Sequence, residues 1–253
     1  MNSSSPLVIC WSGGFDSTLL LLDTLNRLKN NNDETTVQCI TVVSDRIGDS
    51  KVKREKVARE NIKKYIKDNF KNIEIQYREI SLHTDDDRDF TEGDIVFGQP
   101  LLWAMTVIPF LDENAKLLFG YILDDHLTTF KFYKPFIEMI NAASELCQKN
   151  LTFDFPFITC SKEDIINELI KSYPGVIDYL TCCESLSDED NCGKCKPCST
   201  LIKSLINLSA VNTDSINEAN NILEKRFGLS VTVNKLDNCK FNEESQKSGE
   251  VID

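Results

Sequence analysis

The sequence is short of positive charge and has no long apolar run, and each shortage excludes a class of protein. Lys and Arg number 28 against 40 Asp and Glu, a formal charge of −12, so we expect no general attraction to nucleic acid or to an anionic membrane. The longest strongly apolar stretch, residues 101–111, falls well short of the roughly 20 residues of a membrane-spanning helix. Residues 1–5 lack the positive charge and apolar core of a signal peptide. These shortages predict a cytoplasmic protein that does not bind a membrane and has no nucleic acid as its direct ligand.

The ten cysteines divide into a scattered set and a crowded set. The 253 residues are 41% hydrophobic, so the chain can bury a core without disulfide or metal staples. In a reducing compartment, crowded thiols indicate a metal site rather than disulfides. We expect the scattered cysteines to be small buried hydrophobic residues. The scattered set is Cys10, Cys39, Cys147, Cys160 and Cys239, and the crowded set is Cys182, Cys183, Cys192, Cys195 and Cys198.

Strand-like and helix-like patterns alternate along the first part of the chain. This alternation is typical of an α/β, Rossmann-like fold, in which a parallel sheet carries helices on both faces. The expected strands are residues 7–10, 37–43, 73–80 and 116–121, and the expected helices are residues 19–28, 52–66, 101–111 and 132–147.

The pattern changes after residue 160, where a capping signal at Ser161 opens a helix that runs to about residue 171. The crowded cysteines follow, and residues 199–208 and 215–227 are expected to form two closing helices. We therefore predict three parts: an α/β domain over residues 1–180, a small metal-binding helical segment over 181–237 and a flexible tail over 238–253. The acidic run at residues 83–94 is interpreted as a solvated loop, with a gate over the site as the alternative.

A glycine turn joins the first expected strand to the first expected helix. Its two glycines allow the backbone to approach a ligand closely, and its hydroxyls and the helix amides can donate to phosphate oxygens. The other interpretation is an ordinary turn in which Asp16 or Ser17 caps the helix. The turn lacks the lysine of the Walker loop, so it does not predict transfer of a terminal phosphate. Its residues are Ser12, Gly13, Gly14, Phe15, Asp16, Ser17 and Thr18.

Four of the crowded cysteines have the spacing of a tetrahedral zinc site. The pattern is C-x8-C-x2-C-x2-C, formed by Cys183, Cys192, Cys195 and Cys198. Four thiolates around one dication leave no vacant position for substrate or water, so the spacing predicts a structural Zn²⁺ rather than a catalytic one. Lys194 and Lys196 can offset the negative charge. Cys182 competes with Cys183 for the place of first ligand.

The glycine turn resembles the SGGxDS pyrophosphate loop (PP-loop) of the ATP-pyrophosphatase superfamily. Members have an adenine nucleotide alpha hydrolase type of fold and cleave ATP between its α and β phosphates. They adenylate a substrate oxygen, and a nucleophile then displaces AMP. The resemblance implies that ATP is a co-substrate, that Asp16 helps to bind Mg²⁺, and that the following residues hold pyrophosphate: Ser12, Gly13, Gly14, Asp16, Ser17 and Thr18.

The loop and the cysteine spacing together resemble the QueC-type 7-cyano-7-deazaguanine synthases of queuosine precursor synthesis. The segment at residues 158–166 and the stretch through Gly175 and Asp178 to Cys183 also follow that family, so the resemblance spans roughly residues 7–208. These synthases are homodimers that form C–N bonds. They convert 7-carboxy-7-deazaguanine, ammonia and ATP to the amide and then to the nitrile, with release of AMP and pyrophosphate.

Three segments depart from the QueC pattern. The chain has residues 43–48 in place of a DYGQ-type stretch, residues 97–100 in place of a PGRN-type turn, and residues 124–135 in place of the substrate segment. The departures gather where the substrate would be recognised. One alternative is therefore a QueC-like enzyme that attaches an activated deazaguanine to a protein or nucleic-acid acceptor, as in antiphage defence. Others are a nucleotide-binding module without turnover that acts as a protein partner, and sulfur transfer to tRNA.

Outside the loop, several polar residues follow the strand at 116–121. Acidic residues after the carboxyl end of a parallel strand face the crevice where ligands bind, so Asp124 and Asp125 join Asp16 as catalytic candidates. A polar turn with a helix cap explains them equally well. The candidates for substrate binding are Gly120, Tyr121, His126 and Lys134, and Arg46, Lys53 and Arg54 are candidates for phosphate contacts, although a solvated helix face also explains Lys53 and Arg54.

Overall fold

A computed structural model describes residues 6–44, 49–82, 99–123, 132–185, 191–211 and 216–229. The described residues form a five-stranded sheet in the order β3-β2-β1-β4-β5, and every neighbouring pair of strands is parallel. The strands are β1 (Leu7–Cys10), β2 (Val37–Ser44), β3 (Ile75–Leu82), β4 (Lys116–Leu118) and β5 (Thr152–Asp154). The predicted α/β class is therefore confirmed, although the three-residue β5 was not predicted.

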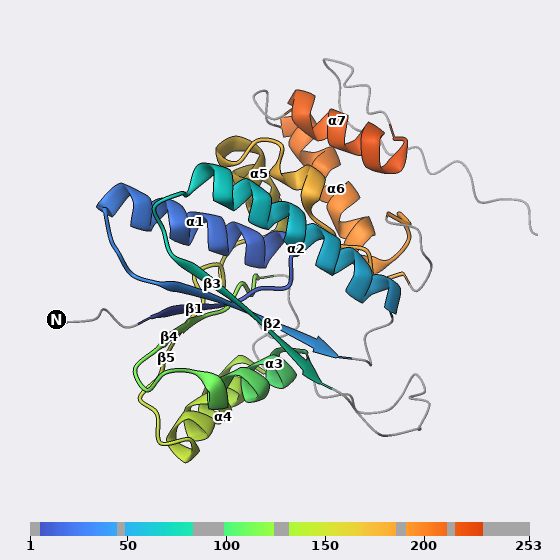
Figure 1. Cartoon of the computed structure of the whole chain (residues 1–253). Helices are drawn as coiled ribbons and strands as arrows, with labels where there is room; N and C mark the ends of the chain where they lie inside the picture. Colours follow the sequence, from blue (N-terminus) through green and yellow to red (C-terminus); the bar gives the residue numbers. More distant parts are fainter. Residues whose placement is uncertain are drawn as a thin grey trace, which may run out of the picture.

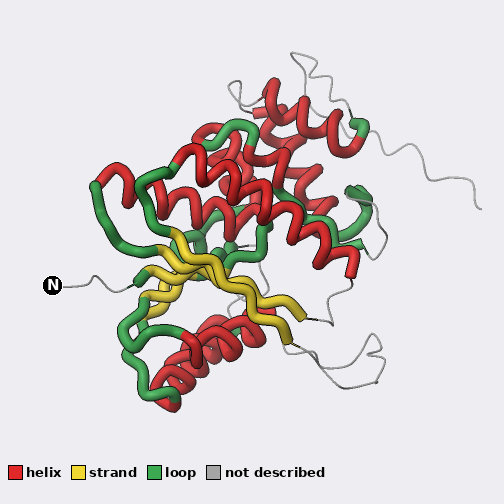
Figure 2. Tube along the Cα trace, in the orientation of Figure 1, coloured by secondary structure: helices red, strands yellow, loops and turns green. Residues whose placement is uncertain are grey.

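Helices cover both faces of the sheet, as predicted (Figure 1). On one face lie α1 (Phe15–Asn31), α2 (Asp49–Asn69), α5 (Lys162–Ser172), α6 (Lys196–Val211) and α7 (Ile216–Phe227). On the other face lie α3 (Gln99–Val107) and α4 (Tyr133–Leu146), and the short turn η1 (Ile108–Phe110) follows α3. A second short turn, η2 (Val176–Tyr179), follows α5. Figure 2 shows the strands in yellow between the two layers of red helices.

Two apolar clusters hold the layers to the sheet. The larger joins β1 to α1, α2, α5, α6 and α7, with Leu21, Leu22, Ile62 and Ile166 fully buried. The smaller packs Ile108, Phe119 and Ile140 between the sheet and α3 and α4. Cys10 and Cys39 belong to these clusters, and burial raises the pKa of both thiols, so they remain neutral. These two scattered cysteines are buried hydrophobic residues, as expected, whereas Cys147 and Cys160 are half-buried and Cys239 lies outside the described residues.

The predicted helix starts and ends are close to those observed. α5 begins after Ser161, whose hydroxyl accepts a hydrogen bond from the Asp164 amide, while the Asp164 carboxylate accepts one from the Ser161 amide. This reciprocal capping box is the one that the sequence predicted. Within the part of the chain that the structure describes, no helix is long and apolar enough to span a bilayer. The acidic run at 83–94 and the tail at 238–253 lie outside the described residues.

Candidate functional site

The glycine turn lies where the chain reverses the direction in which it adds strands. β2 and β3 extend the sheet on one side of β1, and β4 and β5 extend it on the other. In open parallel sheets, the crevice at the carboxyl ends of the strands at such a switch point is the usual place for a ligand. Residues 12–14 leave β1 at this crevice and enter α1 at Phe15.

The start of α1 has no side-chain cap. Gly14 occupies the N-cap position, so the interpretation in which Asp16 or Ser17 caps the helix is wrong. The hydroxyls bond within the turn instead: the Ser12 hydroxyl accepts from the Gly14 amide at 3.2 Å, and the Ser17 hydroxyl accepts from the Ser12 amide at 3.3 Å. The helix dipole and the amides of an uncapped first turn favour an anion.

Two glycines allow the turn to pack closely on its neighbours. Gly13 has φ +91°, and a Cβ there would lie 2.9 Å from Cγ of Arg59 on α2. Gly120 follows β4, and a Cβ there would lie 3.0 Å from both N and Cα of Ser17. Arg59 is buried and donates to the Ser12 carbonyl at 3.0 Å, so α2 also holds the turn in place.

A cavity of about 160 Å³ opens between the turn and the end of β4. Trp103, Phe119 and Tyr121 supply its aromatic wall, and the rings of Phe119 and Tyr121 stack at 5.4 Å. The indole Nε1 of Trp103 is buried and has no hydrogen-bond partner among the described residues. The cavity is lined by Cys10, Ser12, Gly14, Asp16, Ser17, Trp103, Phe119, Gly120 and Tyr121.

Lys162 is a site residue that the sequence analysis did not single out. Its ammonium donates to both carboxylate oxygens of Asp16, at 2.7 and 2.8 Å, and lies 5.6 Å from the ring centroid of Phe15. It is the first residue of α5 and belongs to the segment at residues 158–166, which resembles the QueC pattern. The pair could not be predicted from the sequence, because its residues lie 146 positions apart and no local pattern links the first turn of α1 to that of α5.

The structure brings some of the predicted candidates together and separates others. Gly120 and Tyr121 join the pyrophosphate-loop residues at the cavity, and Thr18 lies just behind it, where its hydroxyl accepts a hydrogen bond from Nε1 of Trp11 at 3.0 Å. Lys134 lies on the exposed surface of α4 beside Glu138 and does not line the cavity. Asp124, Asp125, His126 and Arg46 lie outside the described residues.

The two α2 candidates for phosphate contact differ from each other. Lys53 is exposed. The Arg54 side chain is buried, and its guanidinium donates to the carbonyls of Cys183 and Ser185, at 3.3 and 2.6 Å. A solvated helix face therefore does not explain Arg54, which anchors the start of the cysteine loop.

The four predicted cysteines converge. The sulfur atoms of Cys183, Cys192, Cys195 and Cys198 all lie within 4.8 Å of one another, a grouping that can hold a metal ion. Amides of the loop point at the sulfurs, as when Cys195 N donates to Sγ of Cys192 at 3.3 Å. These backbone donors lower the pKa of the Cys192 thiol to about 6, whereas burial raises that of Cys183 to about 11. Cys182 is outside the group, although its thiol bonds to that of Cys198.

Comparison with known proteins finds a family match for one part of the chain. The family model described as queuosine biosynthesis protein QueC matches residues 117–208, from β4 through the cysteine loop into α6. The comparison with curated proteins finds no match. A solved structure of U34-tRNA thiolase NcsA from Methanococcus maripaludis with its [4Fe-4S] cluster matches 88% of this chain and 72% of its own, at 14% identity and a TM-score of 0.40, a likeness too low to bear on function. Over residues 117–208, the chain is therefore similar to the queuosine biosynthesis protein QueC.

Proposed function

We propose that the chain uses ATP to adenylate the carboxylate of a 7-deazaguanine, 7-carboxy-7-deazaguanine, and then forms a C–N bond with ammonia. The observation that carries this proposal is the loop at the switch point, which lines an aromatic cavity. The loop leads into a helix without a side-chain cap, and Gly13 and Gly120 allow it to pack closely on its neighbours. A flat heterocycle suits stacked aromatic walls, and a polyphosphate suits the start of α1.

The reaction has two displacements. The substrate carboxylate oxygen attacks the α-phosphorus of ATP, the bond to the bridging oxygen of the β-phosphate breaks, and pyrophosphate leaves. Ammonia then attacks the activated carbonyl carbon, the C–O bond to AMP breaks, and the nitrogen loses a proton, which gives the amide. Nitrile formation repeats the activation on the amide oxygen with a second ATP, followed by loss of AMP and two protons.

The residues of the loop act by position and charge. The amides at the start of α1 and the hydroxyls of Ser12 and Ser17 hold the pyrophosphate as its charge increases. The ammonium of Lys162, placed 2.7 Å from the Asp16 carboxylate, can pair with a phosphate oxygen when Asp16 turns to a cation. A bound Mg²⁺ would neutralise further phosphate charge, and the Asp16 carboxylate is the oxygen ligand that suits it.

A structural Zn²⁺ held by the four cysteines completes the proposal. A tetrahedral ion with Zn–S bonds of about 2.3 Å needs sulfur atoms about 3.8 Å apart, so the observed spread of up to 4.8 Å requires only a small contraction of the loop. Four thiolates fill the coordination shell, and the ion then fixes the loop that joins η2 to α6. A homodimer, as in the QueC-type synthases, is part of the same proposal.

The test is to incubate the purified protein with ATP, Mg²⁺, 7-carboxy-7-deazaguanine and ammonium, and to follow the nucleotide and the base by mass spectrometry. AMP with the amide or nitrile is expected. ADP in place of AMP, or no AMP at all, would contradict the proposal. AMP without any amide or nitrile would instead favour an acceptor other than ammonia, such as a protein amine or a nucleic acid.

A matched pair of variants on α1 ties turnover to the loop. Asp16→Asn removes the charge that faces Lys162, and we expect AMP formation to fall about 100-fold. Asp23→Asn is the control, because Asp23 lies on the same helix and bonds to Tyr173 rather than to the cavity. Equal losses in both variants would show that the effect comes from the helix and not from the site.

A further inference from the structure

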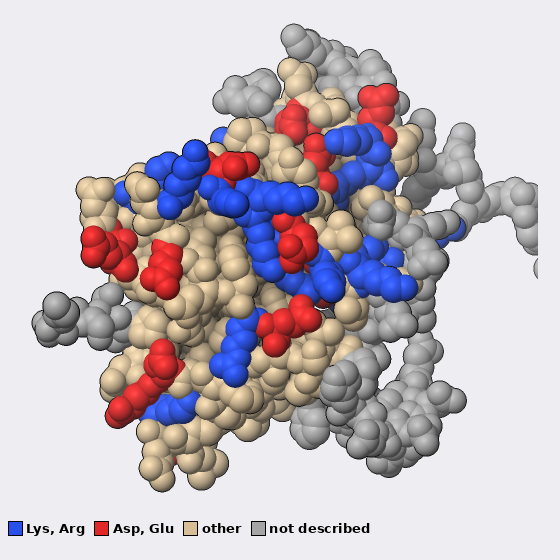
Figure 3. Space-filling view, viewed as in Figure 1, with Lys and Arg blue, Asp and Glu red and all other residues tan. Residues whose placement is uncertain are grey.

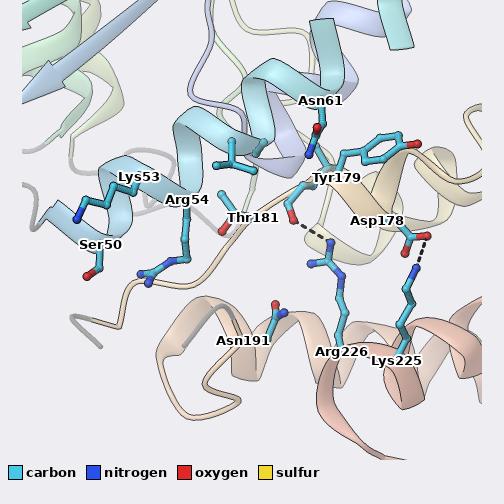
Figure 4. Close-up of a pocket in the computed structure, with 13 residues that line it drawn as sticks. Ser50, Lys53, Arg54, Asn61, Asp178, Tyr179, Thr181, Asn191, Lys225 and Arg226 are labelled. Atoms are coloured by element: carbon cyan, nitrogen blue, oxygen red, sulfur yellow. Dashed lines mark hydrogen bonds and ion pairs between the residues drawn. The ribbon is translucent and has the colours of Figure 1, made fainter. Parts of the chain in front are cut away.

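A second cavity, of about 440 Å³, lies beside α2 (Figure 4). It shares no lining residue with the aromatic cavity. Thr181 marks the boundary, because it lines this cavity while its carbonyl oxygen lies 3.8 Å from the Cβ position of Gly14. The walls come from α2, from the segment around η2 and from the end of α7, and the residues that the argument uses are Lys53, Val57, Tyr179, Thr181, Lys225 and Arg226.

The cavity is basic in an acidic protein. Among the described residues, four cationic side chains line it, Lys53 and Arg54 from α2 and Lys225 and Arg226 from α7, against one carboxylate, that of Asp178. The chain as a whole has a formal charge of −12. Figure 3 shows Lys and Arg side chains gathered along α2, with more over α7. Positive potential concentrated in a concave region attracts anions.

The cations are held in place before any ligand arrives. Arg226 donates to the carbonyls of Ile177 and Leu180, the latter at 2.8 Å. Lys225 pairs with Asp178 at 2.7 Å and remains more than half exposed. Lys53 is exposed on the facing helix, so the ammonium groups of Lys53 and Lys225 stand on opposite sides of the cavity.

The rest of the lining suits a ring rather than a bare anion. Val57 is 61% exposed and Tyr179 is 42% exposed, and both border the cavity among the charges. Side-chain amides of Asn61 and Asn191 also line it. The hydroxyl oxygen of Thr181 is buried and has no hydrogen-bond partner within the described part of the chain. Apolar surface with a few convergent polar groups, in a volume above about 300 Å³, is the usual make-up of a small-molecule site.

We propose that this cavity is a second ligand site, separate from the pyrophosphate loop, and that it binds a nucleotide: a phosphate ester that carries a flat heterocycle. The phosphate is attracted by the cationic side chains that line the cavity, among them Lys53 and Lys225, and the heterocycle lies against Val57 and Tyr179. The nucleotide can be a free mononucleotide or one unit of a single-stranded nucleic acid, because both present the same phosphate and ring.

The test measures binding rather than turnover, so its outcome does not depend on whether the protein forms AMP. The full-length, metal-loaded protein is titrated with the fluorescent N-methylanthraniloyl derivative of GMP. Lys53→Glu and Lys225→Glu are each expected to weaken binding about tenfold or more. The control is Lys56→Glu, which makes the same charge change at an exposed position of α2 that does not line the cavity, and it should leave the affinity unchanged. Thermal unfolding of each variant checks that it is folded.

Competition identifies the source and the limits of the ligand. Displacement of the probe by unlabelled GMP alone assigns a free nucleotide, and displacement by a short single-stranded oligonucleotide as well assigns a nucleic acid. The proposal is overturned if the probe does not bind, if Lys56→Glu weakens binding as much as Lys53→Glu, or if inorganic phosphate competes as well as GMP. Unchanged binding in Ser17→Ala is also expected, and a loss confined to that variant would place the probe at the loop instead.

Discussion

The pyrophosphate loop and the cysteine loop are both tight turns that lead into a helix, but they are stabilised in different ways. The pyrophosphate loop is fixed by packing: Trp11 and Phe15 on either side of it are buried to 99%, and Gly13 and Gly120 remove the atoms that would push its neighbours away. The cysteine loop is instead built around a group of four thiols, of which those of Cys192 and Cys195 are only half-buried. Packing therefore fixes the first loop by itself, whereas the four thiols of the second form a group that could hold a metal ion.

The largest expected effect comes from removing the ion from the cysteine loop. Cys198→Ser deletes a fully buried ligand, and we expect loss of one metal ion per chain and a fall of more than about 3 kcal/mol in the free energy of unfolding. For a domain of this size that lowers the melting temperature by about 6 to 12 °C. Metal analysis and thermal unfolding of the same sample measure both.

Cys182→Ser is the control for this experiment, because Cys182 is adjacent in sequence but outside the four-sulfur group. It should retain its metal, whereas Cys183→Ser should lose it. The opposite result would make Cys182 the first ligand, and a wild-type protein with well under one metal ion per chain would contradict the site.

A smaller effect is expected where the pyrophosphate loop depends on close packing. Gly120→Ala places a methyl group 3.0 Å from backbone atoms of Ser17, which cannot move aside as a flexible side chain would. Overpacking of this kind costs about 1 to 3 kcal/mol, and it should also weaken ATP binding because the start of α1 shifts. Denaturant unfolding and equilibrium binding of ATP give the two values.

Gly175→Ala is the comparison for Gly120→Ala. Gly175 has φ +79° and open space around its Cβ position, so alanine there should cost about 1 to 2 kcal/mol through backbone strain alone. If both variants lose ATP affinity equally, the contact between β4 and α1 is not what supports the loop.

The smallest effect distinguishes a residue that supports the fold from one that faces a ligand. Trp103→Phe removes a buried donor without a partner among the described residues, so stability should change by less than about 1 kcal/mol, while affinity for the ligand of the aromatic cavity falls about 3- to 10-fold. Trp11→Phe should show the reverse pattern, because Nε1 of Trp11 already donates to Thr18. Loss of stability without loss of affinity in Trp103→Phe would place its indole in the core alone.

The sequence predicted those parts of the site that are formed by neighbours in the chain. The strand, turn and helix at residues 7–28 and the four cysteines within 16 positions carry their geometry in their spacing, and both were found as predicted. The strand β5 was not predicted, because three residues are too few for an alternating pattern. β5 nevertheless completes one side of the sheet by pairing with β4.

The contacts that the sequence could not predict join distant segments. The ion pair between Asp16 and Lys162, the anchoring of the cysteine loop by Arg54 and the packing of Arg59 on Gly13 all depend on how α2 and α5 dock on the sheet. No local periodicity encodes such docking. For the same reason, Arg54 looked like a residue of a solvated helix face although it is buried.

The strand order also affects the sequence of events when the protein is made. β1 and α1 leave the ribosome well before α5, yet α1 packs against α5 in the folded protein, as the hydrogen bond between Asp23 and Tyr173 across 150 residues illustrates. Until that later helix has been synthesised, apolar residues such as Leu21 and Leu22 lack part of their packing and are open to the wrong contacts. The glycine turn at residues 12–18 is thus translated well before α5, and a chain truncated before α5 would leave apolar residues of α1 open to chaperones and proteases.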